Sequence, residues 1–167
     1  DAPMLKGKQV AVIGGGDSAL QEALTLIPVC SKVTIITDGG GLTGQAAYVR
    51  QIEEASNVEI KTGAAVKEII GDGAVTGVKI STGGVEETLA VDSVFVFIGM
   101  EPASAIVPDE LKDAAGFVIT DASLRTAKPG LYAAGTIRAG AAFRAASAGG
   151  EGAAAVMGVW GHFAPSN

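Results

Sequence analysis

The chain has 167 residues and a formal net charge of −6, and 18% charged residues stand against 48% hydrophobic ones. This balance is typical of a compact globular protein and excludes an intrinsically disordered chain. Because the pI is about 4.7 and like charges form no block, the sequence offers no electrostatic footprint for nucleic acid.

The first 38 residues predict a strand, a glycine turn, a helix and a second strand. Residues 9–13 are a short β-branched run that is closed by three glycines. From Asp17 the apolar residues follow helical spacing until Pro28, and residues 32–37 form a continuous apolar run. Such a run is typical of a parallel strand that is covered on both faces.

The following 60 residues predict a third parallel strand, a β-meander and a fourth buried strand. Residues 44–55 place apolar side chains on one helical face, and residues 58–60 follow as a strand. The meander consists of three short runs separated by glycine turns, at residues 65–70, 75–81 and 87–91. Residues 94–98 return to a buried strand that ends at Gly99.

The last third predicts irregular structure and one long helix. A short helical turn is expected at residues 109–114, strands at 117–120 and 131–134, and a buried Ala/Gly helix at 142–161. The stretch 139–163 is the most apolar part, but its charges and glycines make it unsuited to span a membrane. With no leader at its start and one cysteine, we expect a soluble cytoplasmic protein that binds no membrane.

The glycine turn after the first strand carries the pattern G-x-G-x-x-A. Gly14 would make the tight turn, Gly16 would let a pyrophosphate approach the backbone, and Ala19 would allow close packing of the helix. An anion would then sit on free amides at the helix N-terminus. Dinucleotide binding is favoured over a purely structural turn, and the residues assigned to it are Gly14, Gly15, Gly16, Asp17 and Ser18.

Asp38 lies 22 residues after Gly16, at the end of the second strand. This is close to the spacing of about 20 residues at which an acid accepts a hydrogen bond from a ribose 2′-OH, so it favours NADH over NADPH. The alternative is a turn residue in front of three glycines, and both interpretations carry about equal weight.

Four segments together resemble the thioredoxin-reductase branch of the flavin-dependent pyridine-nucleotide disulfide oxidoreductases. They are KGKQVAVIGGGDSALQEALTL (6–26), VTIIT (33–37), IGMEPAS (98–104) and PGLYAAGTIRAGAAFRAASAGGEGAAA (129–155). The resemblance implies an α/β fold, with a Rossmann-like NAD(P)H domain at residues 4–99 and the C-terminal part of an FAD-binding domain at 100–167. It also implies hydride transfer from the nicotinamide to FAD and on to a Cys-x-x-Cys disulfide.

The resemblance assigns a second group of cofactor residues to the flavin side. Gly135 and Thr136 would approach the FAD phosphate and ribityl groups, and Arg144 and Ala145 would lie near the flavin. Gly99 is also assigned to cofactor binding. Arg144 could almost equally be an exposed helix arginine, and Glu151 could lie near the flavin or be a solvated helix residue.

The sequence departs from the family at the cysteines, the arginines and one flavin ligand. The amino-terminal FAD segment and the Cys-x-x-Cys are not found in this sequence, so Asp1, matching the acid beside the second cysteine, is better explained as a frayed end. Thr37, Asp38 and Gly39 replace the His-Arg-Arg cluster of NADPH-using members, and Thr136 replaces the flavin-binding Asp.

The resemblance therefore predicts a thioredoxin-reductase-like enzyme with NADH and FAD as cofactors, and an isolated chain that has no catalytic residue, no metal and no activity. Expected partners are an amino-terminal FAD segment or companion chain, a thioredoxin-like protein or small disulfide, and a second copy in a homodimer. Two alternatives are a nucleotide-binding or interaction module without redox activity, and a relative with a non-nicotinamide electron donor. Cys30 is expected to be a small buried apolar group, and His162 is expected to serve in packing or at the surface.

Overall fold

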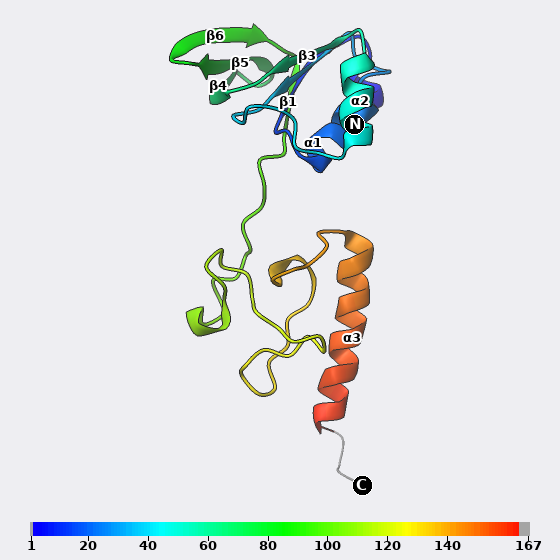
Figure 1. Cartoon of the computed structure of the whole chain (residues 1–167), viewed down its shortest axis with the longest axis vertical. Coiled ribbons are helices and arrows are strands. Elements are labelled where there is room, and N and C mark those ends of the chain that lie inside the picture. Colours follow the sequence, from blue (N-terminus) through cyan, green and yellow to red (C-terminus); the bar gives the residue numbers. More distant parts are fainter. Residues whose placement is uncertain (1, 164–167) are drawn as a thin grey trace. The chain divides into compact units, whose positions relative to one another are not determined.

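The computed structural model describes residues 2–163, so Asp1 and the last four positions of the predicted flavin segment, 164–167, lie outside the described residues. The chain divides into two compact units, and the boundary in the sequence falls between Gly99 and Met100 (Figure 1).

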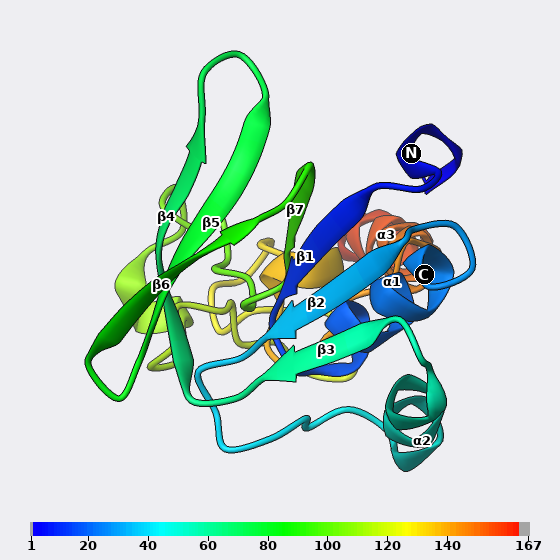
Figure 2. The ribbon, with the colours of Figure 1, turned by 90° about the horizontal axis from the view of Figure 1, so that it is seen from above.

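The first unit is built on a parallel sheet with the strand order β3-β2-β1-β7 (Figure 2). The strands are β1 (Gln9–Ile13), β2 (Lys32–Ile36), β3 (Val58–Lys61) and β7 (Ser93–Val96). Two helices complete the crossovers, α1 (Asp17–Leu26) and α2 (Ala46–Glu54). This architecture confirms the predicted α/β fold with its parallel sheet.

The core of the first unit lies between α1 and the sheet. Helix α1 buries an apolar stripe at helical spacing, which packs on the side chains of β1 and β2 that point to that face. The buried residues of this cluster include Val10, Val12, Leu20, Leu26, Val33 and Ile35. Cys30 belongs to the same cluster, and burial raises the pKa of its thiol, which confirms its predicted role as an apolar core residue.

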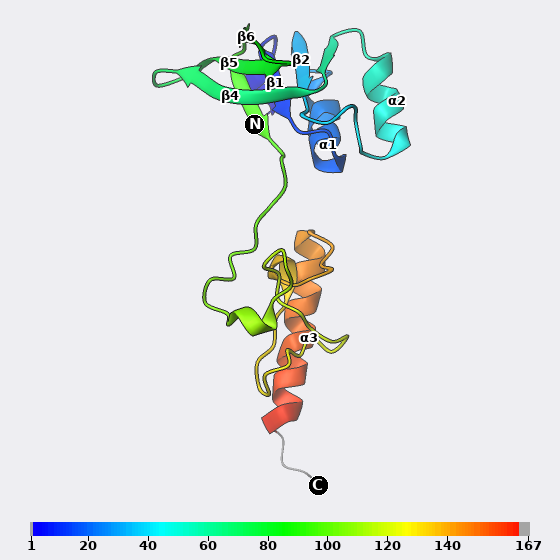
Figure 3. The ribbon, with the colours of Figure 1, turned by 60° about the vertical axis from the view of Figure 1, so that its left-hand side comes forward.

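The opposite face of the sheet is covered by the predicted meander, β4 (Ala64–Gly71), β5 (Val75–Thr82) and β6 (Val85–Ala90). In Figure 3 the meander lies away from α1. Gly83 and Gly84 both have positive φ, 59° and 87°, as the two-residue turn between β5 and β6 requires. Ala11 and Ile36 of the parallel sheet pack with Val78 of β5 in a second buried cluster.

The second unit contains little regular structure apart from one helix. It has two 3-10 turns, η2 (Asp109–Leu111) and η3 (Gly135–Ile137), and the helix α3 (Ala145–Phe163). The predicted strands at 117–120 and 131–134 are wrong, because Val118 and Tyr132 form only isolated bridges. Within residues 2–163 neither segment has an extended neighbour of its own length to complete a ladder.

Helix α3 confirms the predicted long helix, but the prediction that it is buried is wrong. Ala155 is its one buried residue, and the large apolar side chains Met157, Trp160 and Phe163 are more than 70% exposed. The described chain covers one side of α3, where the Tyr132 hydroxyl donates to the Gly158 carbonyl at 3.0 Å. None of the described helices is long and apolar enough to cross a membrane.

A ladder of ion pairs joins the parallel sheet to the meander. Lys32 of β2 contacts Glu59 of β3 at 2.6 Å, Glu59 contacts Lys61 at 3.0 Å, and Lys61 reaches Glu87 of β6 at 3.2 Å. The hydrogen bonds from Lys32 and then Lys61 hold the pKa of Glu59 below its ordinary value.

We expect the free energy of unfolding to fall in acid partly through Glu59. Because the folded-state pKa of this carboxyl is lowered, its stabilisation is present above the ordinary glutamate pKa and is lost as the pH falls through the folded value. Glu59→Gln should remove this part of the pH dependence, about 0.5 kcal/mol for partly exposed pairs. Urea unfolding between neutral pH and pH of about 3 measures it. Glu54→Gln, at a residue without a described ion pair, is the control, and an equal effect there would refute the role of the ladder.

Candidate functional site

The glycine turn begins where β1 ends, between β2 and β7. The Gly14 N–H donates to the Ile36 carbonyl of β2 at 2.8 Å, and its φ is 125°. A Cβ at this position would clash with the carbonyl of Phe97, which follows β7. Only glycine fits here, because both the backbone conformation and the neighbouring strand exclude a side chain.

Gly16 leaves open space at the N-terminus of α1. It is the N-cap residue, with no side chain to bond the first turn, and a Cβ built there would meet no atom within 4 Å. The first N–H groups of a helix have no acceptor inside the helix, so they are available to an anion. Asp17 is the first helical residue, and Ser18 behind it is exposed.

The turn lies at the topological switch point of the sheet. From β1 the chain crosses to β2 on one side, whereas β7 pairs with β1 on the other side. In open α/β sheets ligands bind at the carboxyl ends of the strands beside such a point.

A cavity of about 380 Å³ opens at the same edge of the sheet. Its polar lining comes from Thr37 and Asp38 at the end of β2, and Gly14 also lines it. Its apolar walls include Ile13, Ile36, Ala64, Val66, Ile69 and Ile98. The structure thus brings Gly14 and the exposed Asp38 to one cavity, as the sequence hypothesis requires.

Asp17 and Gly15 contact the loop that follows β2. The Gly15 carbonyl accepts hydrogen bonds from the N–H groups of Thr43 at 2.8 Å and Gly44 at 3.2 Å. The Asp17 carboxylate accepts the backbone N–H of Gln45 at 2.7 Å and its side-chain Nε2 at 3.1 Å. Sequence reasoning missed Gln45, because nothing in the local pattern indicates that it meets a residue 28 positions earlier.

The flavin-side residues assigned from the resemblance lie in the second unit around one narrow recess. Gly135, Thr136 and Arg144 line it, and Ala145 begins α3 directly behind Arg144. Gly135 has a φ of 79°, and the Thr136 hydroxyl is exposed and has no hydrogen-bond partner among the described residues. Gly99 is an exposed residue at the end of the first unit and does not line this recess.

The alternative of Glu151 as a solvated helix residue is wrong, because its side chain is largely buried and lines the same recess. Its carboxylate pairs with both the Nε and the Nη2 of Arg138 and accepts the Gly135 backbone N–H at 2.8 Å. Both side chains are less than one fifth exposed. The Arg138 guanidinium and the Gly135 amide hold the pKa of Glu151 below its ordinary value, and Glu151 raises that of Arg138. The carboxylate thereby fastens the turn η3 to α3.

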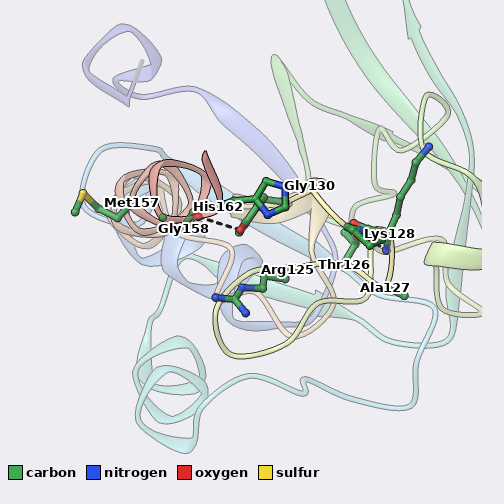
Figure 4. A pocket seen from close by; sticks show the side chains of 11 residues that line it. Arg125, Thr126, Ala127, Lys128, Gly130, Met157, Gly158 and His162 are labelled. Atoms are coloured by element: carbon green, nitrogen blue, oxygen red, sulfur yellow. Dashed lines mark hydrogen bonds between the residues drawn. The ribbon is translucent and has the colours of Figure 1, made fainter. Parts of the chain in front are cut away.

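A hollow of about 650 Å³ lies between α3 and the loop before residue 132. Figure 4 shows the side chains that line it. Arg125, Lys128 and His162 line it, but the Lys128 side chain points away from His162. The His162 ring packs edge-on against Phe163, with 5.1 Å between ring centroids, in agreement with its predicted packing or surface role. Across residues 2–163, no three His, Cys, Asp or Glu side chains are placed to hold a metal ion.

The parallel sheet, its crossover helices and the glycine turn define a Rossmann-like α/β protein. The chain belongs to the pyridine nucleotide-disulphide oxidoreductase family, whose model matches residues 2–152. Within this family it is similar to thioredoxin reductases.

Three relatives illustrate this similarity. The thioredoxin reductase of Treponema pallidum is 36% identical over 142 residues, which cover 83% of this chain and 46% of the relative. That of Listeria monocytogenes is 34% identical over 156 residues, 91% of this chain and 49% of the relative. The structure of Lactococcus lactis thioredoxin reductase matches with a TM-score of 0.83 and 29% identity, over 97% of this chain and 55% of that one. The chain thus spans about half the length of these relatives.

We expect Glu151 to control the mobility of the turn η3. Glu151→Ala removes the acceptor of the Gly135 N–H and leaves Arg138 without its carboxylate, so the Gly135 amide should exchange with deuterium faster. Glu151→Gln keeps an acceptor oxygen without the charge, so its Gly135 exchange rate should lie between those of the unmodified chain and Glu151→Ala. Amide exchange followed by mass spectrometry or NMR measures this. Glu110→Ala in η2 is the control, and unchanged exchange at Gly135 in Glu151→Ala would contradict the proposed fastening.

Proposed function

We propose that this chain is the nucleotide-binding and flavin-facing part of a thioredoxin-reductase-like flavoprotein. In this proposal residues 4–99 bind NADH and residues 100–167 form part of an FAD site. Hydride passes from the nicotinamide to FAD and on to a disulfide of a thioredoxin-like protein or a small molecule. The family membership supports the coarse assignment, and the chain's own residues support the nucleotide site.

The observation that carries the proposal is the geometry of the glycine turn. Gly14 is forced by its contacts with β2 and β7, and Gly16 opens onto the amides of α1. An anionic pyrophosphate fits such a helix N-terminus, because the amides supply hydrogen bonds and the helix dipole favours negative charge. The cavity beside it offers apolar walls to a nucleobase, with a carboxylate in its lining.

The proposed preference for NADH depends on the charges at the end of β2. Asp38 would accept a hydrogen bond from a ribose 2′-OH but would repel a 2′-phosphate. Arg50 on α2 is the one arginine among residues 1–99, and it does not line the cavity. A phosphate at the 2′ position would therefore meet a carboxylate and no guanidinium.

The flavin side of the second unit fits a phosphate-bearing cofactor in two respects. The first turn of α3 presents helix amides next to the recess, and the exposed Thr136 hydroxyl is available as a donor. When bound, FAD would supply the group that accepts the hydride. The residues of this chain would bind and orient it, with Arg138 and Glu151 holding the turn that carries Gly135 and Thr136.

A second candidate function is a nucleotide-binding or interaction module without redox chemistry. Two observations favour it: Thr136 replaces the family carboxylate, and none of the described residues that line the cavity beside Asp38 is an arginine. A relative that takes electrons from a donor other than nicotinamide would lack the arginine cluster in the same way, but Asp38 favours NADH. Homodimerisation also stays a proposal, consistent with the exposed apolar side chains of α3.

We expect the chain to bind NADH at least about tenfold more tightly than NADPH. A carboxylate that faces a hydroxyl in one ligand and a phosphate in the other accounts for about 1–3 kcal/mol. Asp38→Asn should reduce this ratio, and Asp38→Arg should move the preference towards NADPH. Isothermal titration of both nucleotides measures the ratio.

Gly16→Val provides the control for this titration. The added side chain would meet no protein atom at its Cβ, so the fold should survive. It would occupy the proposed place of the pyrophosphate, so the binding of both nucleotides should be lost. If this variant still binds NADH, the nucleotide site is elsewhere. Equal affinities for NADH and NADPH in the unmodified chain would remove Asp38 from its role.

Reconstitution separates the enzyme from the binding module. We expect the 167-residue chain alone to be colourless and inactive, and to self-associate through its exposed apolar surface. An amino-terminal flavin segment from a thioredoxin reductase, supplied in trans with FAD, should restore NADH oxidation against a small disulfide. A yellow complex that never oxidises NADH supports the module, and a monomeric chain that holds FAD unaided contradicts the proposed division of the flavin site.

A further inference from the structure

The loop between β2 and α2 has a composition that should leave it poorly ordered. Residues 38–45 contain four glycines, and a glycine loses more conformational entropy on ordering than any other residue. Asp38, the proposed specificity residue, stands at the start of this loop. The contacts that hold this loop in place therefore influence the position of the Asp38 carboxylate.

The far end of the loop is fastened to the first residue of α1. Gln45 donates both its backbone N–H and its side-chain Nε2 to the Asp17 carboxylate, at 2.7 Å and 3.1 Å. Just before it, the N–H groups of Thr43 and Gly44 donate to the Gly15 carbonyl. These contacts tie the loop directly to the glycine turn. We call the Asp17–Gln45 pair the latch.

Close packing at Gly44 supports the same contact independently of the hydrogen bonds. A Cβ at Gly44 would lie 2.7 Å from Leu20 Cδ1, 3.0 Å from Asp17 Oδ1 and 3.2 Å from the Asp17 backbone N. The loop backbone can therefore approach α1 this closely only because residue 44 has no side chain.

The near end of the loop is fastened as well. The Gly39 N–H donates to Thr37 Oγ1 at 3.3 Å, and the Gly39 carbonyl accepts the Gly63 N–H at 2.9 Å. The loop is thus held at both ends, with the exposed Gly40 between them.

We propose that Gln45 is a positioning residue that sets the nucleotide specificity of this site by latching the loop to Asp17. The inference rests on the proposed nucleotide function. With the latch closed, the loop is ordered before the ligand arrives, and Asp38 stays beside the ribose. With the latch open, the loop is held only at its near end, by the contacts of Gly39 with Thr37 and Gly63. Ordering the rest of the loop then opposes binding, and the exposed Asp38 side chain, no longer backed by an ordered loop, can turn away from a 2′-phosphate. NADH affinity then falls while the discrimination against NADPH shrinks.

The test is titration of the full 167-residue chain and its variants with NADH and NADPH. Gln45→Ala should bind NADH about tenfold more weakly, as for loss of one hydrogen bond to a carboxylate. The ratio of the two affinities should fall at least about threefold, because the NADPH complex gains as the loop loosens. Gly44→Ala leaves Gln45 unchanged, but its added methyl group would crowd Leu20 and the Asp17 carboxylate and so open the latch. This variant should move the ratio in the same direction.

Tyr48→Phe is the matched control. Its hydroxyl accepts a hydrogen bond from Gln21 Nε2 at 2.9 Å, so this variant also removes one polar contact between α1 and α2, but away from the loop. The variant should keep the ratio of the unmodified chain. An equal loss of discrimination in Tyr48→Phe and Gln45→Ala would show a general effect of α1–α2 packing and overturn the proposal.

Gln45→Glu adds a readout that a purely structural role would not move. At pH of about 8 the introduced carboxylate repels Asp17, so the latch should be open and NADH binding weak. Near pH 5 two facing carboxylates can share one proton, because repulsion raises the pKa of one of them. NADH affinity of this variant should then recover, whereas the unmodified chain changes less.

The outcomes separate the two proposals. If the unmodified chain binds neither nucleotide, the proposed function fails. If it prefers NADH but Gln45→Ala and Gly44→Ala keep the same ratio, or Gln45→Glu shows no recovery in acid, the latch fails while the proposed function stands.

Discussion

The first unit depends on one steric constraint, the absence of a side chain at Gly14. The carbonyl of Phe97, after β7, occupies the place where a Cβ would lie, and the Gly14 N–H reaches β2 on the other side. The backbone at Gly14, which follows β1, passes between the ends of β2 and β7. The ends of all three strands therefore lie together at this point. A larger residue would push β7 away from β1 and would open both the switch point and the cavity beside it.

The electrostatics of the site follow from the same arrangement. Its donors are backbone amides at the start of α1, and its nearest assigned charges are the carboxylates of Asp17 and Asp38. Asp17 is occupied by both donors of Gln45, so its oxygens face the loop. The proposed nucleotide site would therefore distinguish ligands mainly by the positions of their hydroxyl and phosphate groups, because its donors are uncharged backbone amides.

The sequence predicted the first unit well because its rules are local. Apolar runs separated by glycines gave β1, α1, β2 and the meander, and the spacing of Gly16 and Asp38 placed both at one edge of the sheet. The contacts that sequence reasoning missed are long-range polar ones. Gln45 bonds to Asp17, which lies 28 positions earlier, and Arg138 bonds to Glu151, which lies 13 positions later. Both pairs are too far apart in the sequence to be predicted from the spacing of residues within one helix or one strand.

The errors in the second unit have a different physical cause. Residues 117–120 and 131–134 have the composition of strands, but a strand needs a neighbour, and within the described chain each finds only isolated bridges. Among the described residues of this unit, four apolar ones are buried, Leu111, Val118, Leu124 and Ala155, so its core is small. Polar contacts such as the Arg138–Glu151 pair therefore contribute to its order, while large apolar side chains of α3 are left exposed by the described chain. Because exposure of that much apolar surface is unfavourable, the proposed flavin side needs both a cofactor and a protein surface that covers the apolar side chains of α3.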